Sequence, residues 1–194
     1  MNASLIRAIK DFVALFESRG LTYAILGGLA ARAHGIPRPT WDVDFAIGID
    51  RDALPELFEA AESLGYVVPA AYRSGWVDAV QGMPIVKFGV AISDRSVDVD
   101  IFLAESLFLK TVLSRRQHAD VDENLQVAVV SPEDLIVLKV LAGRPRDAID
   151  VQDVLFMQGE LDRDYMKHWA ERLGVLENLE MALGKFDEEM PDRL

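Results

Sequence analysis

The stretch that decides the fold runs from Leu26 to Ile47: Leu-Gly-Gly-Leu-Ala-Ala-Arg-Ala-His-Gly-Ile-Pro-Arg-Pro-Thr-Trp-Asp-Val-Asp-Phe-Ala-Ile. It predicts the end of an apolar strand, a short helix, a turn and a second strand. Side chains alternate between the two faces of a strand, so Asp42 and Asp44 project from one face with their Cα atoms about 6–7 Å apart. These carboxylates repel each other unless a cation lies between them, and hard oxygen ligands suit Mg²⁺. The second strand therefore predicts a metal site.

The two glycines predict the other half of the same site. A glycine pair at the start of a helix lets the backbone approach a ligand closely, and the free N–H groups of the first helical turn can bind an anion. A phosphate at Gly27 and Gly28, with a metal at Asp42 and Asp44, makes one site for a nucleoside triphosphate.

This segment resembles the nucleotidyltransferase superfamily, whose catalytic core is of the DNA-polymerase-beta type. The signature is an apolar residue, Gly, Gly or Ser, a spacer, and then Asp-apolar-(Asp or Glu)-apolar. Leu26-Gly27-Gly28 and Asp42-Val43-Asp44-Phe45 fit it, with a spacer at the long end of the family's range. Many members carry Ser directly after the glycines, where this chain has Leu29. A hydroxyl contact to phosphate is therefore not expected at that position.

The length and composition predict a soluble globular protein of one or two small domains. The chain has 194 residues, of which 51% are hydrophobic and 27% charged. It has no cysteine, which excludes disulfides, thiolate metal sites and cysteine nucleophiles and fits a cytoplasmic location. The formal net charge of −12 argues against a broad nucleic-acid-binding surface. No apolar run reaches the length that spans a membrane.

The hydrophobic patterns predict an α+β fold, with a mixed β-sheet flanked by helices and followed by a helical C-terminal region. We place the nucleotidyltransferase-like core at residues 1–130 and the helical region at 131–194, because Ser131-Pro132-Glu133-Asp134 has the order of a helix start. Glycines or prolines interrupt the helical pattern at Gly143–Pro145, Gly159 and Gly174. In the core, the expected strands are Tyr23–Leu26, Val43–Ile47, Ile85–Ile92, Ser96–Leu103 and Gln126–Val130, and the expected helices are Ala3–Ser18, Leu29–His34, Leu54–Leu64 and Ser106–Arg116.

The chemistry calls for a third carboxylate on a neighbouring strand, which completes the metal shell and takes the proton of the attacking hydroxyl. The segment Val97-Asp98-Val99-Asp100-Ile101-Phe102 offers two acids on one face. The family places this acid between apolar residues on a later strand, and both positions fit. We favour Asp100, which lies deeper in the apolar run, and keep Asp98 as the alternative, as a further metal-shell residue.

Basic residues that could bind phosphate occur near the acids and again in the C-terminal region. Pro37-Arg38-Pro39-Thr40 resembles a Pro-Arg-x-Thr stretch of the family, and the guanidinium of Arg38 could bind phosphate oxygens as a fork. The segment from Asp134 to Asp150 is similar to one in the abortive-infection (AbiEii-type) toxin branch. That similarity implies that Lys139 contacts the β- and γ-phosphates and that Arg144 approaches the site. Asp147 and Asp150 share a helical face and could orient either cation.

The leading hypothesis is a metal-dependent nucleotidyltransferase that transfers an NMP from an NTP to an acceptor hydroxyl and releases pyrophosphate. Two Mg²⁺ ions, about 3.5–4 Å apart, would clamp the entering and leaving oxygens. The acceptor could be an RNA end, a protein or a small molecule. The AbiEii resemblance implies a toxin of a toxin–antitoxin pair, with an antitoxin protein as partner. The alternatives are a non-catalytic module that senses nucleotide or binds a partner, and an antibiotic-type small-molecule nucleotidyltransferase.

Overall fold

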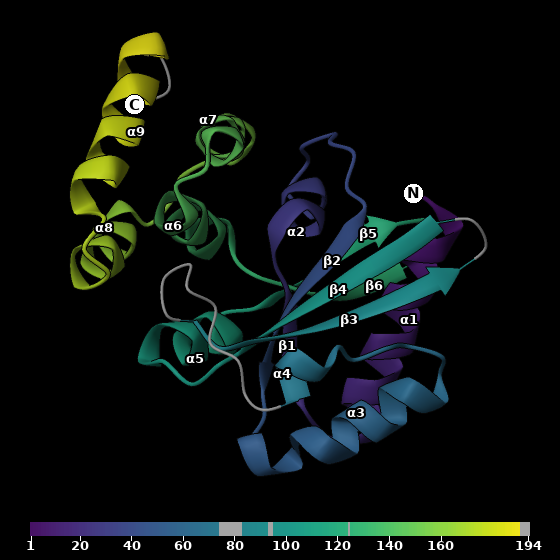
Figure 1. Ribbon diagram of the computed structural model, residues 1–194. Helices are drawn as coiled ribbons and strands as arrows, with labels where there is room; N and C mark the ends of the chain where they lie inside the picture. The colour runs from purple at the N-terminus through teal and green to yellow at the C-terminus, as the bar shows by residue number, and fades with distance from the viewer. Residues whose placement is uncertain (74–82, 93–94, 124, 191–194) are drawn as a thin grey trace.

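The structure of the protein, a computed structural model, describes residues 1–73, 83–92, 95–123 and 125–190. It contains a six-stranded mixed sheet with helices on both faces, which confirms the predicted α+β class (Figure 1). The strand order is β3-β4-β2-β1-β6-β5. The strands are β1 (Thr22–Ile25), β2 (Asp42–Gly48), β3 (Ile85–Ile92), β4 (Arg95–Leu103), β5 (Gln117–Asp122) and β6 (Leu125–Val129).

One face of the sheet carries the aromatic core. Helices α1 (Ala3–Ser18), α3 (Leu54–Ser63) and α4 (Ala70–Arg73) lie on this side, and a 3₁₀ turn, η1 (Arg51–Ala53), leads into α3 (Figure 1). Phe12 is at the centre, with its ring 4.8 Å from that of Tyr66 and 5.1 Å from that of Phe88. Val43 and Phe45 are fully buried in this core. Because strand side chains alternate, Asp42 and Asp44 must project from the opposite face.

The opposite face is covered by the remaining helices, including all those of the C-terminal region. They are α2 (Gly27–Ala33), α5 (Leu107–Ser114), α6 (Pro132–Ala142), α7 (Pro145–Met157), α8 (Arg163–Arg172) and α9 (Leu176–Glu189). A second apolar cluster joins Ala24 and Ala46 of the sheet to Phe108 of α5, Leu135 of α6 and Leu183 of α9. The division at residue 131 stays a prediction, and the residues on its two sides share this core.

Most predicted elements of the core are present with ends shifted by one or two residues, and some differences from the predictions have an evident physical reason. Helix α2 begins at Gly27 rather than Leu29, because Gly27 has a φ of 62° and turns the chain directly into the helix. Strand β4 begins at Arg95 rather than Ser96, which sets Ile92 opposite Arg95. Strand β5 was not predicted. It lies at the edge of the sheet, and its sequence Gln-His-Ala-Asp-Val-Asp has too few apolar residues to give a strand pattern.

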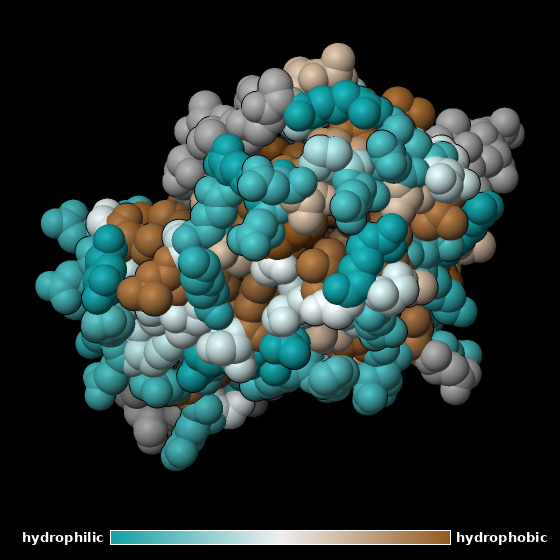
Figure 2. Space-filling view, turned by 90° about the horizontal axis from the view of Figure 1, so that it is seen from below, coloured by the Kyte–Doolittle hydropathy of each residue, from teal (hydrophilic) through white to brown (hydrophobic). Residues whose placement is uncertain are grey.

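The view from the side of α3 and α5 shows a surface covered mainly by hydrophilic side chains, with separate hydrophobic patches between them (Figure 2). Within the described residues, no helix combines the length and the apolar character needed to cross a membrane.

Candidate active site

Four aspartates line up in two rows across strands β2 and β4. These strands run parallel, with Asp42 opposite Asp98 and Asp44 opposite Asp100. The pairing follows from the two Asp-x-Asp patterns, since both strands bury their apolar residues on the aromatic side. The sheet thus brings together acids that are more than fifty positions apart in the chain.

Asp42, Asp44 and Asp100 line one cavity of about 600 Å³, and we call these three residues the carboxylate cluster. Asp98 is exposed and does not line the cavity as Asp100 does. Thr40 Oγ1 donates a hydrogen bond to Asp42 Oδ1 at 2.7 Å, which fixes the orientation of that carboxylate. The placement supports Asp100 over Asp98 as the third acid, whereas the catalytic roles of both stay predictions.

The glycines lie directly against the carboxylate cluster. A Cβ atom at Gly27 would stand 1.9 Å from Asp44 Oδ2, and one at Gly28 would stand 2.9 Å from Thr40 Oγ1. Both glycines line the cavity. Only residues without a side chain leave space here for the acid strand to approach the start of α2, and the same space gives a ligand access to the backbone.

The opposite wall of the cavity is basic. It consists of Arg38, which precedes β2, and of Lys139 and Arg144 at the junction of α6 and α7; we call these three residues the basic wall. Gly143, with a φ of 63°, ends α6 and turns the chain into α7. The cavity therefore has acids on the sheet side and cations on the helix side, as a site for a metal-bound polyphosphate requires.

Two buried aspartates of α7 hold the basic wall. Lys139 Nζ lies 2.8 Å from Asp147 Oδ1 and 2.6 Å from Asp150 Oδ2, Arg144 Nε lies 2.6 Å from Asp147 Oδ2, and Arg38 forms an ion pair with Asp150. The expected shared face of Asp147 and Asp150 is thus present. Lys139 does not extend freely from its helix, because its side chain is only 5% exposed and pairs with both aspartates.

The pKa values reflect this separation of charge. Burial, together with repulsion from Asp42 and Asp100, raises the pKa of Asp44 to about 7. Burial alone would raise the pKa of Asp147 as well, but its bonds with Arg144 and Lys139 bring it below the usual range. The unbalanced negative charge of the site therefore lies on the sheet side, where a cation would be bound.

The carboxylate cluster fits Mg²⁺ in its donor chemistry, since its members are hard oxygen donors that repel one another. In the part of the chain that the structure describes, no three acidic or histidine side chains converge closely enough to hold a metal ion as they stand. Asp100 is instead bonded to Lys87 of β3, and burial and the nearby acids raise the pKa of Asp100 despite that bond. A metal ion at Asp100 would therefore require the side chain of Asp100 to turn from Lys87.

Two cavity residues were missed from the sequence. Lys87 is the only charged residue in the apolar run Ile-Val-Lys-Phe-Gly, a signal that could have been noted. Arg146 also lines the cavity, from the first turn of α7. Two other basic residues of the Leu26–Ile47 stretch do not line the cavity. Arg32 bonds the carbonyl of Val121, and the ring of the buried His34 has a nitrogen 2.8 Å from the Val130 carbonyl oxygen.

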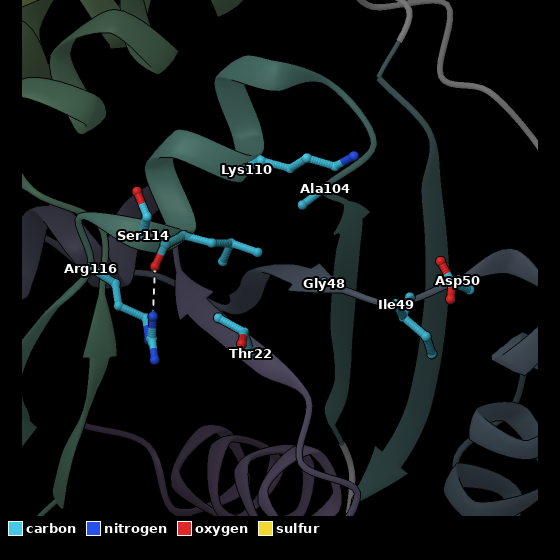
Figure 3. A pocket seen from close by; sticks show the side chains of 9 residues that line it. Thr22, Gly48, Ile49, Asp50, Ala104, Lys110, Ser114 and Arg116 are labelled. Carbon is cyan, nitrogen blue, oxygen red and sulfur yellow. Dashed lines mark hydrogen bonds between the residues drawn. The ribbon is translucent and has the colours of Figure 1, made fainter.

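A second pocket, of about 480 Å³, lies where β2 ends and contains none of the predicted site residues (Figure 3). Thr22, Asp50, Lys110 and Arg116 are among its lining residues, and Arg116 donates a hydrogen bond to the Leu113 carbonyl at 2.8 Å. Its polar groups are exposed, and it presents no acid cluster comparable with that of the first cavity.

The mixed sheet, with an acid pair on one strand, a third acid beside it and glycines at the adjoining helix start, defines a nucleotidyltransferase. Residues 3–182 match the family described as "Nucleotidyltransferase of unknown function (DUF6036)", and the chain belongs to this family. A search of curated protein sequences found no match.

Solved structures with the same fold include two antibiotic-modifying proteins. The solution structure of the antibiotic-resistance factor ANT(2'')-Ia is 17% identical, with a TM-score of 0.53 over 99% of this chain and 96% of that one. The lincomycin-bound lincosamide antibiotic adenylyltransferase LnuA is 13% identical, with a TM-score of 0.54 over 81% of this chain and 99% of that one. At these identities the likeness shows the fold. The comparisons support the nucleotidyltransferase superfamily and do not single out the AbiEii branch.

Proposed function

We propose that the protein transfers a nucleoside monophosphate from an NTP to a hydroxyl group of an acceptor. The observation that carries the proposal is that the carboxylate cluster, the basic wall, Gly27 and Gly28 all line one cavity. The acceptor oxygen bonds to the α-phosphorus, and the bond from that phosphorus to the oxygen bridging to the β-phosphorus breaks. Pyrophosphate leaves with that oxygen, and Asp100 takes the proton of the acceptor hydroxyl.

Asp42 and Asp44 would hold Mg²⁺, which would supply charge neutralisation at the phosphate oxygens. Lys139 and Arg144 orient the β- and γ-phosphates, and Arg38 supports them through Asp150. The basic wall lies on the helix side, so the pyrophosphate departs toward it. The acceptor therefore enters from the side of β4 and β3, because displacement at phosphorus is in line.

A small organic molecule is the acceptor class that we place first. The cavity has an apolar part that suits an organic acceptor or a base, made of Met83, Ile85, Phe102, Leu135, Leu138 and Ala142. The net charge of −12 disfavours a broad RNA-binding surface. LnuA is described as a lincosamide antibiotic adenylyltransferase, and ANT(2'')-Ia occurs in complex with adenylyl-2''-tobramycin. A toxin role, with RNA or protein as acceptor and an antitoxin partner, rests on the resemblance of residues 134–150 alone.

The test is to incubate the protein with each α-labelled NTP and Mg²⁺, together with an RNA, a protein or a small-molecule fraction of a cell extract. Label in one fraction identifies the acceptor class, and the double variant Asp42→Asn/Asp44→Asn should give none. NTP binding that depends on Mg²⁺, without label in any fraction, would contradict transfer and favour a non-catalytic nucleotide-binding module.

A further inference from the structure

Lys87 extends the row of acids across a third strand. On β3 it lies opposite Asp100 of β4, which itself lies opposite Asp44 of β2. Its ammonium forms an ion pair with Asp100 Oδ2, and its side chain lines the same cavity. In the neighbouring row, Gly89 lies opposite Asp98, so β3 presents no side chain to Asp98. The strand register thus gives a cation to Asp100, the acid that lines the cavity.

Lys87 is also distinguished by what the other cations do. The three members of the basic wall bond Asp147 and Asp150, which are not part of the carboxylate cluster. Among the ion pairs of the described residues, only that of Lys87 joins a cation to a member of the carboxylate cluster. Lys87 and the basic wall therefore pair with different acids of the cavity.

The position of Lys87 corresponds to the acceptor side of the proposed reaction. The basic wall lies on the helix side, and Lys87 is on β3, beyond Asp100. In a site with two metal ions, one ion serves the leaving phosphates and the other the entering oxygen. A second divalent ion at Asp100 would have to displace the ammonium of Lys87, a residue that strand pairing places directly opposite Asp100.

We infer that the Lys87 ammonium takes the place of the second metal ion at this site. The protein binds one divalent ion with the nucleotide, at Asp42 and Asp44, and the Lys87 ammonium takes the place of the other at Asp100. This inference rests on the proposed function and replaces the sequence-based expectation of two Mg²⁺ ions. Lys87 positions Asp100 toward the acceptor oxygen and offsets its charge without a metal.

The test counts bound ions without any catalytic turnover. Mn²⁺ binding is measured by electron paramagnetic resonance, with the α,β-methylene analogues of ATP, GTP, CTP and UTP at saturation. We expect one Mn²⁺ per wild-type chain and two per chain of the variant Lys87→Met, in which Asp100 is free to bind an ion. Lys110→Met removes a lysine from the other pocket (Figure 3), and this control should bind one.

Two ions in the wild type, or one ion in Lys87→Met, would overturn the inference while leaving the proposed function intact. Nucleotide-dependent Mn²⁺ binding in none of the proteins would overturn the proposed function and the inference with it. Circular dichroism of Lys87→Met establishes that the count refers to folded protein, and the wild-type count decides on its own if the variant does not fold.

Discussion

At the scale of single residues, the site depends on carboxylates held close together on a rigid sheet. Asp44 is the clearest case, because it packs against Gly27 and because burial and repulsion from Asp42 and Asp100 raise its pKa. A residue that is unfavourable for the metal-free fold and well placed for a cation is typical of a functional group rather than a structural one.

Asp44→Asn should stabilise the metal-free protein and abolish transfer. The pKa of Asp44 is about 7 in the folded state, above its ordinary value of 3.8, so ionisation opposes folding. The free-energy cost of ionising Asp44 in the folded state is absent below pH 3.8 and grows as the pH rises from 3.8 to about 7. Above that pH the cost is constant, at no more than about 4 kcal/mol. Thermal unfolding in EDTA at pH 5 and pH 8 measures it. A melting temperature of the variant equal to that of the wild type at pH 8 would contradict this.

Asp100→Asn should slow transfer far more than Asp98→Asn. Asp100 lines the cavity beside Asp44, and general-base assistance is worth about 10²–10⁴-fold in rate. Asp98 is exposed and outside the cavity lining, so we expect it to act only indirectly. Its loss should lower the transfer rate by on the order of tenfold to a hundredfold. The measurement is the initial rate at saturating NTP. A dead Asp98→Asn with a mild Asp100→Asn would reverse the two assignments.

At the scale of elements, the start of α2 and the junction of α6 with α7 set the two sides of the cavity. Both junctions use a glycine in the left-handed region, Gly27 and Gly143, to change direction within one residue. The precision of the site therefore depends on backbone conformations that other residues adopt only with strain.

Gly27→Ala should destabilise the protein by more than about 1 kcal/mol, because its new methyl group would overlap Asp44 and the φ is positive. Gly184→Ala in the middle of α9 is the matched control. No atom lies within 4 Å of the added Cβ there, so it should stabilise by about 0.5–1 kcal/mol. Urea unfolding compares the two. Equal effects would mean that Gly27 is not constrained by the acid strand.

Lys139→Met should weaken both NTP binding and the fold. It leaves the buried Asp147 and Asp150 each with one fewer partner, which costs roughly 1–3 kcal/mol. Adding Asp150→Asn should recover part of the stability and none of the affinity. Lys185→Met, in an exposed pair with Glu189, should cost only about 0.3–0.5 kcal/mol. Urea unfolding and calorimetry with Mg²⁺ and NTP measure these. Unchanged NTP affinity in Lys139→Met would exclude the C-terminal helices from the site.

The sequence was sufficient for the side of the site that is local in the chain. The alternation of side chains along a strand predicted that Asp42 and Asp44 share one face, and the second Asp-x-Asp pattern identified Asp100 as a candidate. It was not sufficient for Lys87, because its partner depends on the hairpin register. The expected strand ends would have set Ile92 opposite Ser96 and Lys87 opposite Ile101, whereas the structure pairs Lys87 with Asp100. A slip by one residue exchanges the faces. The burial of Lys139 could not be predicted from the sequence either, since it depends on how α7 packs against α6.

At the scale of the whole molecule, the C-terminal helices complete the core of the sheet as well as the site. Tyr165 of α8 donates a hydrogen bond of 2.5 Å to the buried Asp134 of α6, and Arg115, which follows α5, lies 3.9 Å from the centre of the Tyr165 ring. The contacts of Arg115 with Tyr165 and, at 3.5 Å, with Asp134 connect the core region to the helical region.

Residues 1–130 expressed alone should therefore not unfold cooperatively. Without the C-terminal helices, Ala24, Leu26, Phe108, Leu109 and Val112 would lose most of their cover. Exposing this many apolar side chains costs more than the few kcal/mol by which a domain of this size is stable. Thermal unfolding by circular dichroism, with residues 1–190 as control, measures this. A sharp transition in the fragment would support an independent domain ending near residue 130.

The shared bonds of the basic wall have a kinetic consequence. Lys139 is paired with Asp147 and Asp150, and Arg144 with Asp147, in the absence of an anion, so a departing pyrophosphate leaves both cations with carboxylate partners. The product therefore competes with protein carboxylates for the same charges until it escapes. We expect a wall of this kind to bind polyphosphate with moderate strength and to release it quickly, so that turnover is limited by a step other than product release.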